Sequence, residues 1–579
     1  MVSVVGKLRL PWPALLTALL TFGAPAEPIV PNRLASYFPY GVYVGAETIT
    51  EGSGENLTRL GVPFGFYYQR VIDDLAKHHV NLICIQNTSC YTNSVLVRML
   101  RYGESRGVLA WLSENISGAG PDDSISEAWL QHWAAERIAP LSSETGLLAW
   151  SPIDEPLEVT LPKWQRHKAA IESADPNHPV IAVTHGGPKG FEQIGQAQAC
   201  DRYPVMVDSP GVWSIGPFVR RYTDVSPVPV WFVVQAFEGE GRRAPTPAEL
   251  RLMTYAALAE GAKGIAYFSY TNSLANEVNS PGPLWDEIGA LGRVLVSLGP
   301  DLVAAGPVAR RSRQVIVKAS GNGDPDRPEG MPPADHSLLE LGSGRGLVVV
   351  YNTSRIEPLR VVMSPESSGK RLCDLTLPAR TGPDPRATQA LRLRLEPGDG
   401  RVLLLAAEGD HRAIAAKARE RLSAADRNAL GPDLDVAANW GIETADITRA
   451  MERDRTPKSV KQAAKLLGQR EGATPAFWRA RRSLDGFRRT LDSYHCLVAA
   501  MYAAGVPDAD LEEQRHHYHY ANEYLLRERA FANAERAALG DTASLDEEAQ
   551  GRINAIREQL GGAMSPGSPA SSEATTAGR

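Results

Sequence analysis

Two adjacent carboxylates, Asp154 and Glu155, follow a short apolar run that contains Trp150, and Pro156 comes directly after them. An apolar run bounded by turn residues predicts a buried strand, and the end of such a strand is where acids are placed for chemistry. A partly buried acid beside another negative charge keeps its proton more readily, as a general acid must. We therefore take Glu155 as the first catalytic candidate and Asp154 as the group that orients it. The alternative is a solvated acidic loop after an ordinary strand.

Eight strand-like segments, each followed by a helix-like segment, occupy the first half of the chain. The predicted strands are 38–45, 80–87, 108–113, 146–156, 179–185, 199–205, 229–237 and 264–270. Eight such units in about 250 residues match a closed parallel barrel better than an open sheet. No glycine-rich phosphate turn follows the first strand, which removes the usual reason to prefer an open nucleotide-binding sheet. The prediction is a (β/α)8 TIM barrel over residues 32–302, in the α/β class.

The pattern of predicted secondary structure changes after residue 302. Residues 303–408 hold short β-rich runs separated by Gly, Pro, Asp and Ser, which predicts a small antiparallel β-sandwich. Residues 409–561 are helical in pattern and richly charged, and we expect a C-terminal helical domain there. Residues 562–579 have the composition of a disordered tail. None of these segments carries a catalytic motif.

The N-terminus has the order of features found in an export signal. Lys7 and Arg9 precede an apolar stretch at 15–22, and the small residues Ala24 and Ala26 flank Pro25. We expect a signal peptide over residues 1–26 and a secreted or periplasmic protein. The apolar stretch is shorter than the roughly 20 residues that span a bilayer, so no stable membrane span is expected after cleavage.

Charge and metal-binding residue types narrow the range of partners. A net charge of −6 over 579 residues indicates neither a nucleic acid nor an anionic membrane as partner. The five cysteines are scattered without CxxC spacing, so they form neither a disulfide framework nor a zinc site. His516, His517 and His519 lack an HExxH pattern or an accompanying carboxylate pair. We predict no metal and no cofactor, and the sequence leaves the oligomeric state undetermined.

Polar and aromatic side chains follow the predicted strands. Because the active site of a (β/α)8 barrel lies at the carboxyl ends of its strands, these side chains should meet at one mouth. The predicted ligand-binding residues are Glu47, Gln86, Asn87, Trp111, Trp150, Asp154, His185, Tyr203, Gln235 and Tyr270. Further acids at strand ends are Glu114, Asp201, Glu238 and Glu240. Acids and amides bond hydroxyl groups, aromatic rings stack on sugars, and lysine and arginine are few, so we expect a carbohydrate rather than a phosphate.

This pattern resembles the (β/α)8 glycoside hydrolases, especially the large retaining clan. In that clan the acid/base Glu ends strand four in Asn-Glu-Pro, and the nucleophile Glu ends strand seven. Asp154-Glu155-Pro156 is similar to the first motif, with Asp in place of Asn, and the runs at 201–204 and 251–267 resemble the barrels of secreted bacterial glycosidase-like proteins. The resemblance covers the barrel, about half of the chain. It implies a hydrolase of an oligo- or polysaccharide with Glu155 as general acid/base.

The seventh strand departs from this family at Gln235. A neutral amide cannot act as a glycosyl nucleophile. Three possibilities remain: Glu238 or Glu240 is the nucleophile, Asp201 is the base of an inverting mechanism, or the barrel binds sugars without cleaving them as a cell-surface scaffold. A carboxyl separation of about 5 Å would indicate retention, and about 6.5–9.5 Å inversion. A metal-dependent hydrolase is disfavoured because no His-x-His ends strand one.

Overall fold

The structure is a computed structural model. It describes residues 33–34, 36–45, 65–86, 88, 91–114, 125–187, 195–209, 211–239, 241–270, 283–321, 323–376, 387–439, 442–453 and 456–474. The predicted signal peptide, the tail and the part of the helical domain beyond residue 474 lie outside this range, as do Glu47, Asn87, Glu240, His516, His517 and His519. None of the helices in the described ranges combines the length and the apolar character needed to cross a membrane.

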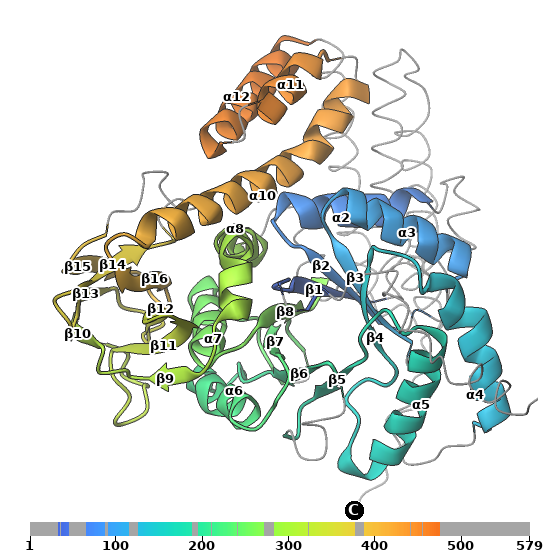
Figure 1. The fold of residues 1–579 in the computed structure, drawn as a ribbon, viewed down its shortest axis with the longest axis horizontal. Helices are drawn as coiled ribbons and strands as arrows, with labels where there is room; N and C mark the ends of the chain where they lie inside the picture. The colour runs from blue at the N-terminus through green and yellow to red at the C-terminus, as the bar shows by residue number, and fades with distance from the viewer. Residues whose placement is uncertain are drawn as a thin grey trace, which may run out of the picture.

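Eight parallel strands form one sheet in the order β4-β3-β2-β1-β8-β7-β6-β5. They are β1 (Tyr40–Gly45), β2 (Leu82–Gln86), β3 (Leu109–Ser113), β4 (Leu147–Ser151), β5 (Ile181–Thr184), β6 (Ala197–Arg202), β7 (Val230–Gln235) and β8 (Gly264–Phe268). A parallel bridge between Trp150 and Val180 joins β4 to the segment that leads into β5, so the sheet closes on itself. The predicted (β/α)8 barrel is confirmed (Figure 1).

Alternation of side chains along the strands builds an inner and an outer core. On β7, Trp231 and Val233 belong to the apolar cluster inside the barrel, whereas Phe232 and Val234 belong to the larger cluster under the helices. The helices that cover the barrel are α2 (Gly65–Lys77), α3 (Asn93–Ser105), α4 (Glu127–Trp133), α5 (Leu161–Ala174), α6 (Ile215–Thr223), α7 (Pro247–Ala259) and α8 (Pro283–Ala304). Side chains at the strand ends are therefore held on a rigid frame.

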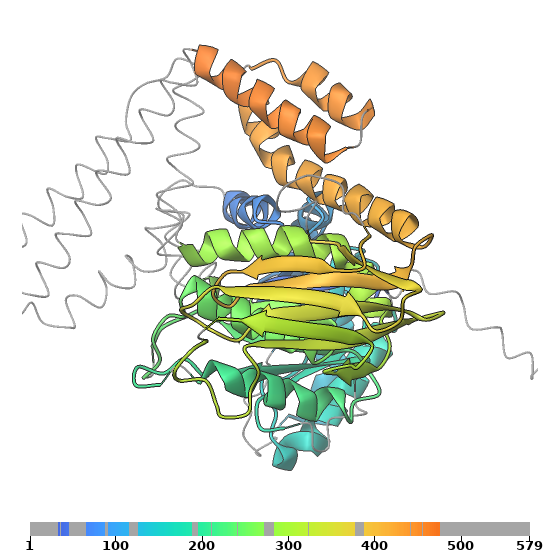
Figure 2. The same ribbon diagram turned by 90° about the vertical axis from the view of Figure 1, so that its left-hand side faces the viewer.

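Two antiparallel sheets follow the barrel, as the short β-rich runs predict. One contains β10 (Val315–Ser320), β13 (Leu359–Pro365) and β15 (Leu391–Leu395). The other contains β9 (Val308–Arg310), β11 (Ala334–Gly342), β12 (Arg345–Asn352), β14 (Lys370–Asp374) and β16 (Gly400–Ala407). Val361 and Met363 of the first sheet share an apolar core with Val348 and Leu403 of the second. The sheets lie beside the barrel in Figure 1, and in Figure 2 they face the viewer in front of it.

The second sheet also packs on the barrel. Val349 and Leu404, on its other face, belong to the same apolar cluster as the α7 residue Tyr255. The Trp213 indole donates a hydrogen bond to the Thr353 carbonyl at 2.9 Å, which joins the segment before α6 to the end of β12. The sheets therefore brace the barrel from outside, and none of their side chains lines the cavity described below.

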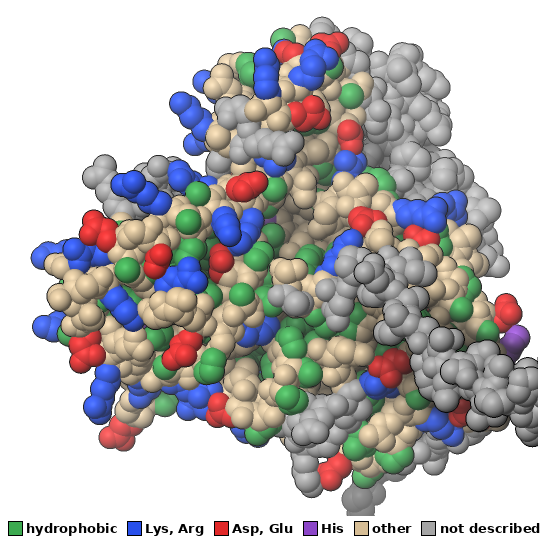
Figure 3. Space-filling model, viewed as in Figure 1, with side chains coloured by type: hydrophobic (Ala, Val, Ile, Leu, Met, Phe, Trp, Pro, Cys, Tyr) green, Lys and Arg blue, Asp and Glu red, His purple; other side chains and the backbone are tan. Residues whose placement is uncertain are grey.

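Three helices end the described chain: α10 (His411–Asn439), α11 (Ala445–Arg453) and α12 (Pro457–Ala473). Asp426 of α10 accepts two hydrogen bonds from the Arg293 guanidinium of α8, both at 2.7 Å. The carboxylate of Asp433 pairs with Lys77 of α2 at 2.5 Å. These ion pairs attach α10 to the barrel, and α11 and α12 extend from it (Figure 1). Figure 3 shows both basic and acidic side chains on the lobe that α11 and α12 form at the top of this view.

Candidate functional site

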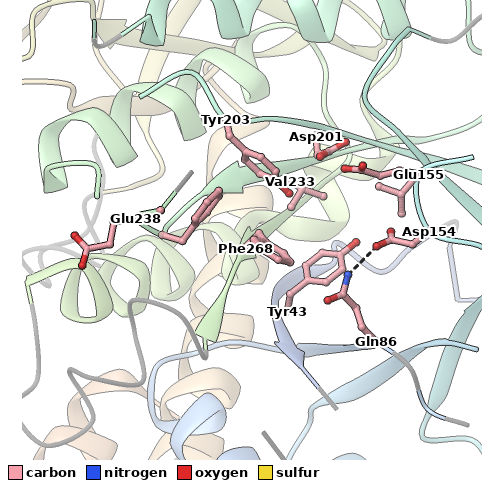
Figure 4. Close-up of a pocket in the computed structure, with 12 residues that line it drawn as sticks. Tyr43, Gln86, Asp154, Glu155, Asp201, Tyr203, Val233, Glu238 and Phe268 are labelled. Atoms are coloured by element: carbon pink, nitrogen blue, oxygen red, sulfur yellow. Dashed lines mark hydrogen bonds between the residues drawn. The ribbon is translucent and has the colours of Figure 1, made fainter. Parts of the chain in front are cut away.

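The carboxyl ends of the barrel strands surround a cavity of about 500 Å³. One part of its wall is polar and acidic, formed by Gln86, Asp154, Glu155, Asp201 and Glu238. The other part is aromatic and apolar, formed chiefly by Tyr43, Tyr203, Val233, Phe237 and Phe268. The volume is in the range of small-molecule sites, and the mixture of apolar wall and converging polar groups is typical of them (Figure 4).

Asp154 lies in the loop after β4 and faces β2. The Gln86 side-chain amide donates a hydrogen bond to its Oδ2 at 2.9 Å. Burial raises the pKa of Asp154 to about 6, and the neighbouring charge of Glu155 adds to this effect, whereas the Gln86 hydrogen bond opposes it. Asp154 is therefore a carboxyl group that changes charge close to neutral pH.

Glu155 and Asp201 come together from the ends of β4 and β6. One carboxyl oxygen of Glu155 lies within 4.8 Å of one of Asp201, and Figure 4 shows the two carboxyl groups facing each other. Burial raises the pKa of Asp201 well above its usual range, and the charges of Glu155 and Asp154 raise it further. Asp201 is only 2% exposed, so its surroundings favour the protonated form of this carboxyl.

The backbone at Glu155 is strained. Its φ of +42° falls in the left-handed region, which a residue with a Cβ adopts at a cost of about 1–3 kcal/mol. Such strain persists only where the surrounding structure holds it, and it clusters at functional sites. The unusual backbone conformation of Glu155 therefore indicates a functional role for its side chain in the cavity.

His185, at the end of β5, completes a group of three possible ligand atoms. Its Nδ1 lies 3.3 Å from Oε2 of Glu155, and one carboxylate oxygen of Asp201 lies within 4.8 Å of both. One imidazole and two carboxylates can hold a divalent cation such as Zn²⁺. The sequence does not predict this set, because the three residues are far apart along the chain and lack metal-motif spacing.

Three of the predicted ligand-binding aromatics lie in packing positions rather than at the cavity. The Trp150 indole faces outward and donates to Asp175 at 2.8 Å. The Tyr270 hydroxyl donates to Asp74 of α2 at 2.9 Å. Trp111 is buried inside the barrel, with its ring 5.6 Å from that of Tyr43. Their large apolar bodies fill the core, and only Tyr203 of the predicted aromatics lines the cavity.

Gln235 does not face a ligand either. Its Oε1 accepts a hydrogen bond from the Val205 amide at 2.9 Å, and its Nε2 donates to the carbonyls of Val205, Phe237 and Arg243 at 3.0–3.3 Å. The side chain is fully buried. Gln235 therefore ties together the loops after β6 and β7, a task that needs both a donor and an acceptor.

Glu238 lines the cavity but is turned away from the other acids. Strand β7 ends at Gln235, so Glu238 lies on the following loop. Figure 4 shows its side chain pointing away from Glu155 and Asp201. The possibility that Glu238 is a nucleophile opposite Glu155 is thus not supported by this arrangement.

The acid at the end of β3 is neutralised. Glu114 is fully buried, and its carboxylate lies 3.1 Å from the Arg137 guanidinium. The Thr88 hydroxyl donates a second hydrogen bond to it at 2.5 Å. Glu114 is part of the barrel's internal structure and does not line the cavity.

Several cavity residues are absent from the sequence prediction, and Tyr43 is the most important. It lies inside β1, and its hydroxyl has no hydrogen-bond partner among the described residues. Period-two alternation places Tyr43 on the inner face of β1 together with Gly41 and Gly45. Two small residues beside an inward tyrosine are the signal from which the sequence could have indicated a cavity there.

Neither a protein-family model nor a curated protein matches the chain. Among solved structures, it is similar to a β-galactosidase from Bacillus circulans sp. alkalophilus, with 8% identity, 64% of this chain and 99% of that chain covered, and a TM-score of 0.44. It is also similar to a glycoside hydrolase family 5 structure from Bacteroides vulgatus, with 11% identity, coverage of 59% and 86%, and a TM-score of 0.41. A putative α-galactosidase from Bacteroides fragilis has 12% identity, coverage of 59% and 76%, and a TM-score of 0.38. At this level of similarity, the side chains at the mouth must decide what the barrel does.

Proposed function

We propose that the protein hydrolyses glycosidic bonds of an oligo- or polysaccharide, with Glu155 and Asp201 as the catalytic pair. The observation that carries this proposal is the contact of two carboxyl groups at the ends of β4 and β6, inside a cavity of about 500 Å³. Hydrolysis of a glycosidic bond requires two such groups, one to donate a proton and one to act as nucleophile or base. The aromatic wall offers surfaces on which the C–H faces of a sugar stack.

The spacing favours retention of anomeric configuration. One oxygen of Glu155 and one of Asp201 lie no more than 4.8 Å apart, which is compatible with the roughly 5 Å of retaining enzymes and below the range of inverting ones. An inverting pair needs about 6.5–9.5 Å so that a water molecule fits between the acid and the sugar. The proposal therefore replaces the inverting role considered for Asp201 with a role in double displacement.

In this mechanism Asp201 is the proton donor and Glu155 the nucleophile. Asp201 holds its proton in the buried position and transfers it to the departing glycosidic oxygen, while Glu155 attacks the anomeric carbon and forms a glycosyl ester. The Asp201 carboxylate then takes a proton from water, whose oxygen displaces Glu155 and restores both groups. His185, 3.3 Å from Glu155, holds the nucleophile in place. This assignment differs from the acid/base role that the family resemblance implies for Glu155, because burial puts the proton on Asp201.

A trapping experiment tests the pair and its roles. The protein is first screened for cleavage of plant, algal and bacterial polysaccharides, and the anomer of the product is read by NMR. A 2-fluoro glycoside of the cleaved sugar should then label Glu155, as peptide mass spectrometry would show. A label on Asp201 would reverse the two roles, and product of inverted configuration would exclude double displacement. Activity should persist in EDTA, since no step uses a metal.

A non-catalytic carbohydrate-binding protein is the second candidate. The observation that favours it is Gln235, which occupies the strand-seven position of the family's nucleophile and is fully engaged with backbone groups. Saturable binding of a polysaccharide without cleavage, unchanged in Glu155→Gln, would establish this function in place of hydrolysis. Glu158→Gln, an exposed acid three residues away, is the matched control for Glu155→Gln.

We also propose that the chain is exported, on the basis of the basic, apolar and small-residue order within residues 1–26. Expression of the full chain in a bacterial host, followed by fractionation and N-terminal sequencing, tests this. A mature chain that starts near Glu27 outside the cytoplasm is the expected result. Retention of the full N-terminus in the cytoplasm would contradict it.

A further inference from the structure

The cavity is strongly acidic for a site that binds a neutral sugar. Asp154, Glu155, Asp201 and Glu238 line it, and no lysine or arginine is among the described lining residues. Neutral sugars are commonly bound by amides, hydroxyls and single acids. Glu238 points away from the other acids, but the three converging carboxyls of Asp154, Glu155 and Asp201 already exceed what hydroxyl recognition needs. The composition of the wall favours a ligand that carries positive charge.

Two of the arginines near the mouth are paired with other acids. Arg137 pairs with Glu114, and Arg243 pairs with Glu249 at 2.7 Å. Arg242 donates to the Tyr203 carbonyl at 3.3 Å, and its guanidinium lies 5.9 Å from the centroid of the Tyr203 ring. Arg137 and Arg243 thus pair with acids outside the cavity, whereas Arg242 lies against the aromatic part of the wall, at Tyr203 and Phe237.

Two buried polar atoms in the cavity wall have no protein partner among the described residues. They are the hydroxyl oxygen of Tyr43 and Oδ1 of Asp201, in side chains that are 5% and 2% exposed. Figure 4 shows the Tyr43 hydroxyl pointing toward the acidic wall, beside Asp154. A buried polar group without a hydrogen-bond partner is destabilising, so these atoms indicate a polar ligand that bonds both of them.

The aromatic wall suits a cation as well. The Phe268 ring lies between those of Tyr43 and Phe237, with ring centroids 5.6 Å and 5.5 Å from it. The faces of such rings attract ammonium groups, and the attraction grows when the group is withdrawn from water. Acids on one side and rings on the other form a site for a small organic cation.

We propose that the sugar unit bound in this cavity is an amino sugar, in which a free protonated amine replaces a hydroxyl group. Asp154 accepts a hydrogen bond from the ammonium group, and the Tyr43 hydroxyl and Oδ1 of Asp201, which keeps its proton for the leaving oxygen, bond neighbouring sugar hydroxyls. This inference rests on the proposed function, which supplies the premise that the ligand is a sugar. It adds the charge of the ligand, which the family resemblance does not supply.

The crowding of the acids supports this assignment. Burial and the charge of Glu155 raise the pKa of Asp154, and the same two causes raise that of Asp201. An ammonium group among them would replace like-charge repulsion with attraction. An acidic sugar such as a uronic acid would increase the repulsion, and an N-acetylated sugar would bring no charge to offset it.

Binding measurements on matched oligosaccharides test the proposal. The probes are hexamers of glucosamine and of galactosamine, each with free and with N-acetylated amines, and a galacturonic acid hexamer. Isothermal titration calorimetry with wild-type protein and with Glu155→Gln, at pH 7 and low salt, should show at least one free-amine hexamer binding at least about 10-fold tighter than its acetylated form. Asp154→Asn should lose most of this preference, whereas Asp208→Asn, an exposed acid on the loop after β6, should keep it.

The outcomes separate this inference from the proposed hydrolysis. Equal or tighter binding of the acetylated or uronic hexamers, or no binding of any free-amine hexamer, would overturn the amino-sugar assignment. A free-amine preference without any cleavage would support it and count against hydrolysis. Cleavage of a neutral or acidic glycan alone would leave the hydrolase intact and reject the amino sugar.

Discussion

Two buried acids at strand ends of the same barrel have opposite surroundings. Glu114, after β3, lies against the Arg137 guanidinium and accepts a hydrogen bond from Thr88. Asp201, at the end of β6, lies against another carboxyl group, that of Glu155, and one of its oxygens has no partner among the described residues. Both are almost completely buried.

This difference distinguishes a structural carboxyl group from a catalytic one. A buried carboxylate is stable when a cation and hydrogen-bond donors offset the loss of water, as they do for Glu114. A buried carboxyl that faces a like charge stays protonated, a state that costs stability at neutral pH but allows proton donation. Both residues lie at a strand end, so their position does not distinguish them. The group that each carboxyl contacts determines whether it is structural or catalytic.

The largest expected effect is on activity. Asp201→Asn should lower the rate of hydrolysis by about 10²–10⁴-fold, because an amide cannot donate the proton to the leaving oxygen. The same variant should fold at least as stably as the wild type at pH 7, since it removes an acid from a site that opposes ionisation. Rate assays on the cleaved polysaccharide and urea unfolding measure the two effects. Asp208→Asn is the control, and wild-type rates in Asp201→Asn would refute its catalytic role.

Glu114→Gln should have the opposite effects: it should lower stability and leave the rate of hydrolysis unchanged. Removal of the carboxylate leaves Arg137, whose side chain is only 11% exposed, without its ion-pair partner. Breaking a buried pair from one side costs about 3–5 kcal/mol of unfolding free energy. The fraction that remains folded should keep the wild-type rate per active site. A stable but inactive Glu114→Gln protein would mean that the distinction between the two acids is wrong.

The third prediction concerns the pH dependence of stability at Asp154. Its pKa is raised from 3.8 to about 6, so its contribution to stability is fully present below about pH 4 and is lost as the pH rises through 6. Asp154→Asn should therefore be more stable than the wild type above pH 7, by at most about 3 kcal/mol, and the difference should vanish below pH 4. Urea unfolding of both proteins across pH 4–8 checks this. A difference that does not change with pH would contradict it.

The smallest effect is expected at Gln235. In Gln235→Glu, a carboxylate would face the carbonyl oxygens of Val205, Phe237 and Arg243 in place of the amide that donates to them. We expect a loss of about 1–3 kcal/mol in stability and no gain in hydrolysis. Thermal unfolding and the rate assay measure both. A gain in activity would instead indicate that the barrel lost a nucleophile at this position.

The barrel was predictable because its signal is repeated. Eight apolar runs with helical segments between them predict the same element many times, so an error in one boundary leaves the fold intact. The prediction of Asp154, Glu155 and Asp201 as site residues follows from that frame, since the sequence places all three among the side chains expected at its mouth. The sandwich was predictable from turn residues between short β-rich runs, which the two sheets confirm.

The aromatic residues were less predictable, and the reason is geometric. A tryptophan at a strand end faces the mouth, the interior or the helices according to a one-residue difference in where the strand stops. Trp150 faces the helices and Trp111 the interior, whereas Tyr203 reaches the cavity. Sequence position alone does not carry that difference.

By itself, the sequence determined the alternation that closes a parallel barrel and the set of acids available at its carboxyl end. Only the tertiary structure decided which acid meets which partner. Glu114 and Arg137 are 23 residues apart, and Glu155 and Asp201 come from the ends of two different strands. The effect of a buried charge depends on the groups within a few ångströms of it, and folding, not sequence order, sets those distances.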